Sequence, residues 1–340
     1  MKIWTKDEII ARFNMERAVR MIEEGFIAYS RKTVQVPPVQ NFQFDAANGD
    51  CCVKSAYVDG AAAFAVKVST GFYDNPKQGL PSNNGLIVLF SATTGEPVAL
   101  LQDEGWLTCV RTALAGQLAA RLLAPREVQG IGIIGSGEQA RLQLEYLQPV
   151  TGCRDVFVWG PSAKNRKQYV EEMSALGFNV RAMDSAEAVA ANANLIVTTT
   201  PSREPLLRSD WIRNGTHITA VGADSTGKQE LDPVIVGRAG VIVVDSIDQC
   251  SKYGEISHAL SAGLIHAKQL LELGTLLDAG KRARDDTDPA QITVADLTGV
   301  AVQDVQIAAS VSQRQRIDLS RIQHGHASCH DQPTALKPVP

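Results

Sequence analysis

A glycine-rich turn limits the fold of this 340-residue chain more than any other feature of its sequence. The turn reads Gly135-x-Gly137-x-x-Ala140 and joins an apolar, strand-like run to a helix-like segment. The first glycine permits a tight bend, the second lets backbone N–H groups approach a pyrophosphate, and the small third residue allows close helix–strand packing. The start of the helix also favours an anion. The sequence therefore predicts a dinucleotide-binding Rossmann domain.

The hydrophobic pattern on either side of residue 126 predicts an α/β protein with two domains. After it, short apolar strands alternate with helices, as in a buried parallel sheet. Before it, strand-like runs separated by Gly- and Asn-rich turns are typical of an antiparallel sheet. A long C-terminal helix is expected to return to this N-terminal α+β domain, which would make it discontinuous. The expected parts are the first part of the substrate and dimerisation domain at 1–125, a Rossmann domain at 126–298, a returning helix at 299–322 and a disordered tail at 323–340. Helices are expected at Trp106–Leu123, Ala267–Ala279 and Val302–Ser320.

The end of the second Rossmann strand usually selects the cofactor, because an acid there bonds the ribose hydroxyls of NAD. After Trp159 no acid occurs until Glu171. Ser162 and Lys164 are placed to hold a 2′-phosphate, so NADP(H) is favoured and NAD(H) stays open; alternatively, Lys164 lies on a solvated helix face. The hydroxyls of 198–200 are expected at the cofactor edge of the sheet. The candidate cofactor-binding residues are Gly135, Gly137, Glu138, Gln139, Ser162, Lys164, Thr198, Thr199, Thr200 and Thr112.

Four stretches carry groups suited to act on a substrate. They contain Lys67, Arg111, Asp224 with Lys228, and Thr298-Gly299. Asp224 closely follows a predicted sheet strand, so it should lie at the carboxyl edge where the nicotinamide ring binds. Taken singly, each of these charges has a simpler interpretation as part of a surface ion pair.

Several motifs occur together in a characteristic order. They are Lys67 in a strand, Gly95-Glu96-Pro97, Leu107-Thr108-x-x-Arg111-Thr112-Ala113, the glycine turn, Thr198-Thr199-Thr200-Pro201, Gly222-Ala223-Asp224 with Gly227-Lys228, Glu230-Leu231-Asp232, and Asp245 before Gln249 and Gly254-Glu255. In this order, over residues 9–309, the chain resembles the ornithine cyclodeaminase/μ-crystallin family.

The resemblance implies a fold, an assembly and a chemistry. The N-terminal domain would bind the substrate and form a homodimer. Members reduce imines, oxidise amino acids, or deaminate ornithine with an internally recycled NAD. Lys67 and Arg111 would bind the α-carboxylate, and Asp224 would exchange a proton with the substrate nitrogen or an attacking water. The candidate catalytic residues are Asp224, Lys67 and Arg111, and the candidate substrate-binding residues are Lys54, Lys67, Arg111, Lys228, Thr298 and Gly299.

The chain departs from the ornithine-specific pattern at two places. Those enzymes resemble Pro-Pro-Arg after the N-terminal helices, whereas this chain has Pro37-Pro38-Val39. They also tend to carry an acid thirteen residues before the strand lysine, where this chain has Lys54. If Lys54 faces the pocket, it would repel a substrate ammonium and favour a neutral or carboxylate side chain; alternatively, it lies on the solvated face of its strand. The segment 71–81 looks more like the branch found in ectoine-utilisation proteins.

These observations predict an NAD(P)-dependent imine reductase or amino-acid dehydrogenase acting on a small imino or amino acid. Two alternatives stay open: an ornithine cyclodeaminase, which is an ammonia-lyase that recycles NAD, and a non-enzymatic μ-crystallin-like binding protein. Retention of Lys67, Arg111 and Asp224 argues against the binding protein, which needs no proton-transfer group.

The net charge and hydropathy give the expected partners and location. A net charge of −4 provides no electrostatic reason to expect nucleic acid or an anionic membrane as a partner. No apolar run approaches the roughly 20 residues that span a bilayer, so a cytoplasmic protein is expected. No metal site is predicted; the tail from His324 to His330 has soft ligand types, but we interpret it as disordered.

Overall fold

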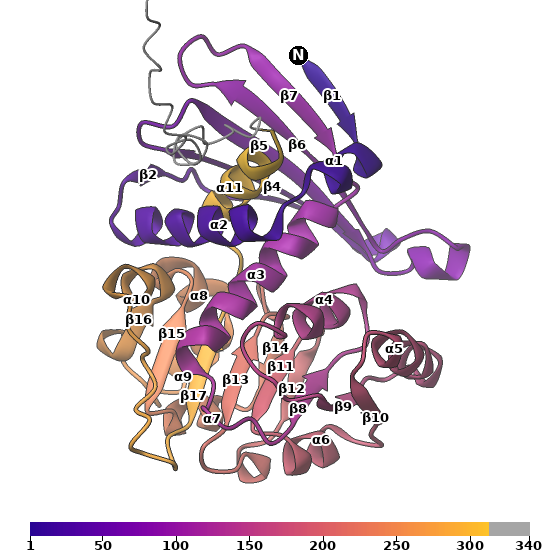
Figure 1. Ribbon diagram of the computed structural model, residues 1–340, viewed down its shortest axis with the longest axis vertical. Coiled ribbons are helices and arrows are strands. Elements are labelled where there is room, and N and C mark those ends of the chain that lie inside the picture. Colours follow the sequence, from indigo (N-terminus) through magenta and orange to yellow (C-terminus); the bar gives the residue numbers. More distant parts are fainter. Residues whose placement is uncertain (313–340) are drawn as a thin grey trace, which may run out of the picture.

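The computed structural model describes residues 1–312, and these form two halves built on separate sheets (Figure 1). The first half contains a seven-stranded sheet. β1 runs parallel to β7, and the other neighbouring strands are antiparallel, as predicted for this region. In spatial order the strands are β1 (Lys2–Thr5), β7 (Pro97–Gln102), β6 (Asn83–Ser91), β5 (Ala63–Phe72), β4 (Gly49–Val58) and β2 (Val34–Gln35), and β3 (Gln40–Phe44) also pairs with β4.

Helices pack against this sheet, and two of them begin at residues whose side chains cap the helix. Thr5 and Glu8 form a capping box at the start of α1 (Lys6–Arg12), and the Asn14 side chain accepts a hydrogen bond from Arg17 N at the start of α2 (Met15–Ser30). The last described helix, α11 (Ala301–Ser312), packs against α2 and lies on β4 and β5. The N-terminal half is therefore completed by residues from the C-terminal end of the described chain.

The second half is an eight-stranded parallel sheet of Rossmann type. In spatial order its strands are β10 (Asn179–Ala182), β9 (Asp155–Trp159), β8 (Ile131–Ile134), β11 (Leu195–Thr198), β13 (His217–Ala220), β17 (Thr293–Asp296), β15 (Val241–Val244) and β16 (Leu270–Glu272). The central strands are buried along their whole length, which explains their continuous apolar sequence. The helices of the second half are α4 (Glu138–Tyr146), α5 (Ala163–Ala175), α6 (Ala186–Asn192), α7 (Pro233–Arg238), α8 (Ile247–Tyr253), α9 (Glu255–Ser261) and α10 (Leu273–Ala279). In addition, β12 (Arg203–Leu207) pairs with β14 (Gln229–Leu231) in a small separate sheet. Among the described residues, the 3₁₀ helices are η1 (Asp45–Ala47), η2 (Asn75–Gln78), η3 (Ser209–Trp211) and η4 (Ala267–Gln269).

One long helix connects the two halves. α3 (Trp106–Leu123) has the predicted bounds and runs from the first sheet down to the Rossmann sheet (Figure 1). It packs against α2 and α11 above and against α4, β13 and β17 below. Most of its residues are buried around the whole circumference, as expected for a helix inside a core. The hydrophobic core is consequently continuous across the two halves.

The prediction of one helix over Ala267–Ala279 is wrong. This segment forms η4, then β16, and only then α10. β16 pairs in parallel with β15 at the edge of the Rossmann sheet, so backbone hydrogen bonds to a neighbouring strand override the local helical tendency. The helix predicted over Val302–Ser320 is described only to Ser312. The rest of the returning segment 299–322, and the tail 323–340 with its histidines and cysteine, lie outside the described residues.

Within residues 1–312, no helix is both long enough and apolar enough to cross a bilayer.

Candidate active site

The glycine turn lies between buried β8 and α4. Gly135 has a φ of +117°, and a Cβ added there would come within 2.4 Å of the Thr199 hydroxyl. A Cβ added at Gly137 would meet no described atom within 4 Å, so a ligand can approach the backbone there. No described side chain caps the N–H groups at the start of α4. The turn therefore fits a dinucleotide pyrophosphate, which would take these free N–H groups.

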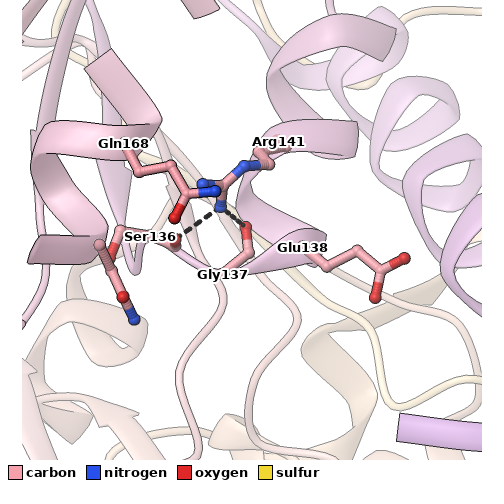
Figure 2. A pocket seen from close by; sticks show the side chains of 6 residues that line it. Ser136, Gly137, Glu138, Arg141 and Gln168 are labelled. Atoms are coloured by element: carbon pink, nitrogen blue, oxygen red, sulfur yellow. Dashed lines mark hydrogen bonds between the residues drawn. The ribbon is translucent and has the colours of Figure 1, made fainter. Parts of the chain in front are cut away.

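Arg141 on α4 adds a positive charge to this turn, and the sequence prediction missed it. Its Nη1 donates to the carbonyl oxygens of Ser136 at 2.7 Å and Gly137 at 3.0 Å (Figure 2). Its Nε binds the Glu172 carboxylate of α5, and this bond lowers the pKa of Glu172. In Figure 2 the side chain of Glu138 points away from the guanidinium. The pocket drawn there is lined by Ser136, Gly137, Glu138, Arg141, Asn165 and Gln168.

The predicted cofactor-selecting residues lie just past the end of β9. Ser162 caps α5, because its hydroxyl accepts a hydrogen bond from Asn165 N at 3.2 Å. Lys164 is exposed on the first turn of the same helix. Arg166 is tied to the Gly160 carbonyl through its Nη1. No acid follows this strand before Glu171. Asn165 and Gln168 of α5 line the pocket beside the glycine turn, and Ser162 and Lys164 stand at the start of the same helix.

The hydroxyls of 198–200, which were expected at the cofactor edge of the sheet, all have hydrogen-bond partners within the protein. Thr198 Oγ1 donates to Glu230 at 2.7 Å, and Thr200 donates to it through both Oγ1 at 2.8 Å and N at 2.6 Å. Thr199 Oγ1 donates to Ile134 O at 3.2 Å. Glu230 also accepts from Gly222 N at 2.9 Å. Burial raises its pKa to about 7, although these hydrogen bonds oppose the shift. Glu230 belongs to one of the sequence motifs but was not among the predicted site residues. Its hydrogen bonds connect the loops after β11 and β13.

Two other candidate cofactor residues lie where α3 meets α4. The Gln139 side chain donates to Cys109 O at 3.2 Å, and the Thr112 hydroxyl donates to Thr108 O at 2.9 Å. Gln143, which was not predicted, donates to Thr112 O at 3.1 Å. These bonds set the position of α4, and hence of the glycine turn, against α3.

Asp224 and Lys228 form an ion pair at the junction of the two halves. Lys228 Nζ is 2.7 Å from Asp224 Oδ1, and it also lies 5.9 Å from the ring centre of Tyr73 in the first half. The Asp224 side chain is 51% exposed, and that of Lys228 is 12% exposed. Surrounding protein atoms act to raise the pKa of Asp224, but Lys228 and, more weakly, Lys54 hold it below its usual range. Asp224 is therefore a carboxylate at neutral pH, open to a ligand.

Lys54 and Lys67 lie opposite each other on the hairpin β4–β5. Their exposed fractions are 9% and 2%, which excludes the alternative that Lys54 lies on the solvated face. Lys54 Nζ donates to Gly299 O at 2.7 Å. Burial lowers the pKa of Lys67 to about 8; Asp304 opposes this shift, and Arg111 and Lys54 add to it.

Arg111 on α3 completes a cation cluster, which we define as Lys54, Lys67 and Arg111. Its exposed fraction is 5%, so it is not part of a surface ion pair. Arg111 Nε lies 3.0 Å from Asp304 Oδ1, and Lys67 Nζ lies 3.1 Å from the same oxygen. Asp304 stands in the first turn of α11 and was not among the predicted site residues. Lys67 and Arg111 thus share one acid, and Lys54 adds a third positive charge nearby, which leaves a surplus of positive charge for an anionic ligand.

The Thr298-Gly299 turn brings the end of the Rossmann sheet against this cluster. Gly299 has a φ of +80°, and a Cβ there would lie 2.5 Å from Arg111 Nη1. Asp245 holds the turn, since it accepts from Gly299 N at 2.6 Å and from the Thr298 hydroxyl at 3.1 Å. Thr298 is 3% exposed. The predicted Gly299 therefore contributes its backbone to the site, whereas the Thr298 side chain supports the turn.

Comparisons with known proteins show the family of this chain. The model of the ornithine cyclodeaminase/mu-crystallin family matches residues 2–317. The chain is 42% identical to a putative dehydrogenase of Rhizobium meliloti over 311 residues, which cover 91% of this chain and 94% of that protein.

Two solved structures share the fold over nearly the whole chain. One is an archaeal alanine dehydrogenase dimer with bound NAD, with a TM-score of 0.82 and 34% identity, covering 92% of this chain and 94% of that one. The other is the Δ1-pyrroline-2-carboxylate reductase of Thermococcus litoralis in complex with NADH and L-proline, with a TM-score of 0.85 and 30% identity, covering 92% and 96%. Both support the predicted Rossmann fold with a second, discontinuous half.

Proposed function

The chain belongs to the ornithine cyclodeaminase/mu-crystallin family, and from this premise we propose that it is an NAD(P)-dependent imine reductase or amino-acid dehydrogenase. The reaction would move hydride to or from a carbon that carries both a nitrogen and a carboxylate. Two of the similar proteins of known structure are an amino-acid dehydrogenase and a reductase of the cyclic imine Δ1-pyrroline-2-carboxylate, which catalyse the two directions of this chemistry.

The observation that carries the proposal is the pairing of a cation cluster with a separate, exposed carboxylate. Lys54 helps to lower the pKa of both Asp304 and Asp224, which supports the proposal that the cluster and Asp224 form one site. A substrate that has a carboxylate at one end and a protonated nitrogen beside it matches this arrangement. The carboxylate would bind the cluster, and the nitrogen would face Asp224.

Each group then has a distinct task. Lys67 and Arg111 hold the α-carboxylate and so orient the neighbouring carbon, an effect that can supply a large part of an enzymatic rate enhancement. An imine accepts hydride well only when its nitrogen is protonated. The Asp224 carboxylate stabilises that iminium during reduction and accepts a proton from the amine during oxidation. Lys228 keeps Asp224 ionised.

The nicotinamide dinucleotide supplies or accepts the hydride when it is bound. The Gly135–Gly137 turn, the free N–H groups of α4 and the Arg141 charge suit its pyrophosphate. The similar structures carry NAD or NADH. We propose that this chain prefers NADP(H), because Ser162 and Lys164 replace the acid that would bond the ribose hydroxyls of NAD.

The substrate class and the assembly are further parts of the proposal. With Lys54 buried beside Lys67, the substrate side chain would be neutral or acidic rather than basic. A homodimer is proposed because the similar alanine dehydrogenase is described as a dimer. We also propose that the protein is cytoplasmic, as expected from its sequence.

A screen of imines and amino acids with both cofactors tests the function. The purified protein should change the absorbance of the nicotinamide in step with substrate consumption. Ammonia release from ornithine without a net absorbance change would instead show a cyclodeaminase. Cofactor binding without turnover of any substrate would show a binding protein.

A further inference from the structure

Asp304 makes an unusual set of contacts at the base of the cation cluster. A single oxygen, Oδ1, lies 3.1 Å from Lys67 Nζ and 3.0 Å from Arg111 Nε. The exposed fractions of the three side chains are 2%, 2% and 6%. Among residues 1–312, neither Asp304 oxygen receives a hydrogen bond of good geometry, and Arg111 Nε makes none, so the contacts of Oδ1 are ion pairs defined by distance. The acid is therefore stabilised through the two cations of the cluster and by its place in the first turn of α11.

Gln303, the preceding residue, holds the same guanidinium from a second side. Its Oε1 accepts from Arg111 Nη1 at 3.1 Å, and its Nε2 donates to Arg111 O at 3.2 Å. Arg111 Nε is paired with Asp304 by charge and Nη1 is hydrogen-bonded to Gln303, so Nη2 is the group of this guanidinium that can turn to another anion. Lys67 is likewise paired with Asp304 by charge, and an ammonium has three N–H donors with which to reach a second anion.

We propose that Asp304 is a positioning residue whose Oδ1 holds Lys67 and Arg111 side by side, so that their remaining N–H groups receive one substrate carboxylate. The inference rests on the proposed function, since it assigns the carboxylate to these two cations. Lys67 comes from β5 and Arg111 from α3, and the two cations repel each other. Asp304, on α11, joins these elements and offsets that repulsion.

A merely structural counterion would have a different signature. Loss of such a group lowers the stability and the amount of active enzyme, but the surviving molecules keep normal kinetics. Loss of a positioning residue lowers kcat in properly folded enzyme, because a displaced carboxylate moves the reacting carbon from the nicotinamide. It also makes the Lys67 ammonium easier to deprotonate, since Asp304 is the main group that favours its charge.

The test is Asp304→Asn, which keeps the shape and removes the charge. Both measurements use enzyme that binds cofactor fully. The first is kcat on the best substrate. The second is the Kd of pyruvate for the complex of the enzyme with reduced cofactor, measured without ammonia between pH 6.5 and 9.5. We expect kcat to fall at least about tenfold and the alkaline loss of pyruvate binding to begin about half a pH unit lower than in wild type. Unchanged kcat, or an unshifted pH profile, would overturn the inference.

Two further variants keep the result interpretable. Glu272→Gln removes the acid of another ion pair, formed with Lys32 outside the cluster, and should leave both quantities unchanged. If Asp304→Asn does not fold, Asp304→Glu replaces it; it keeps the charge but displaces it, so kcat should fall while the pH profile stays in place. Normal kcat in Asp304→Glu would overturn the positioning role. If wild-type enzyme reduces no imine and oxidises no amino acid, the proposed function fails instead.

Discussion

Lys54 and Lys67 are direct cross-strand neighbours on β4 and β5, and both ammonium groups are buried beneath α11. Like charges in this relation normally destabilise a sheet. Here each has its own acceptor, Gly299 O for Lys54 and Asp304 for Lys67. The arrangement keeps two positive charges in one small site, which determines the kind of ligand that the site can accept.

Lys54→Glu should change the substrate preference. Because the buried positive charge repels a terminal ammonium, the wild type should prefer acidic or neutral side chains, and the variant should lose activity on these while gaining on basic ones. The measurement is kcat/KM for matched acidic, neutral and basic substrates. Lys77→Glu, at an exposed ion pair of the same half, is the control. A wild-type preference for ornithine or lysine would refute the prediction and favour the cyclodeaminase.

Asp224→Asn should bind cofactor normally yet keep less than about a tenth of wild-type turnover, because an amide cannot accept a proton. Cofactor titration and steady-state rates on the same preparation check both statements. Lys228→Met is the companion variant. It removes the cation that lowers the pKa of Asp224, so the acid side of the kcat/KM profile should move to higher pH. Substantial turnover in Asp224→Asn would assign the proton transfer to another group.

Arg111→Ala should lower kcat/KM at least about tenfold, because a charge-assisted hydrogen bond to a carboxylate contributes about 1.5–3 kcal/mol. It should also lower the free energy of unfolding, since Asp304 then keeps Lys67 but loses a buried partner; breaking a buried ion pair typically costs about 3–5 kcal/mol. Denaturant titration measures this second effect. Arg126→Ala removes an exposed arginine–acid pair and serves as the control. Equal kcat/KM in a folded Arg111→Ala enzyme would remove Arg111 from the substrate site.

Substrate capture should weaken as the pH rises through about 8, the pKa of Lys67. Burial places that pKa below the ordinary lysine value, so the free enzyme loses the ammonium, and with it a carboxylate ligand, in the mildly alkaline range. The Kd of pyruvate for the complex with reduced cofactor reports this directly, because pyruvate itself does not titrate there. Lys67→Arg, which stays charged, should abolish the dependence if it folds. A flat wild-type profile up to pH 10 would contradict the assignment.

The wild type should bind NADP(H) more tightly than NAD(H), and Ser162→Asp should reverse this order. Aspartate preserves the cap of α5, because its side chain can still accept from Asn165 N, while it supplies the acid that bonds the ribose hydroxyls of NAD. Titration by nicotinamide fluorescence compares the four affinities. Asn14→Asp, at the cap of α2 in the other half, controls for the added charge. A clear wild-type preference for NAD(H) would show that Ser162 and Lys164 are only surface residues.

Much of the fold was predictable because its signals are local. The turn at Gly135, the alternation of apolar strands with helices, the caps at Thr5 and Asn14, and the bounds of α3 depend on residues close together in the chain. The strand Leu270–Glu272 could not be predicted from such local signals. It exists only because β15 provides a neighbour at the sheet edge, and no short-range pattern carries that information.

The sequence by itself determined which chemical groups are available: a dinucleotide turn, a strand lysine, a helix arginine, an acid after a sheet strand and Lys54 in place of an acid. Only the tertiary structure decided how they are paired. It joined Asp304 to Lys67 and Arg111, Glu230 to Thr198 and Thr200, and Arg141 to the glycine turn. The physical reason is that ion pairs and hydrogen bonds act over a few ångströms in space, whereas these partners come from different strands and helices. The charge state of each group depends on the burial and the neighbours that folding alone provides.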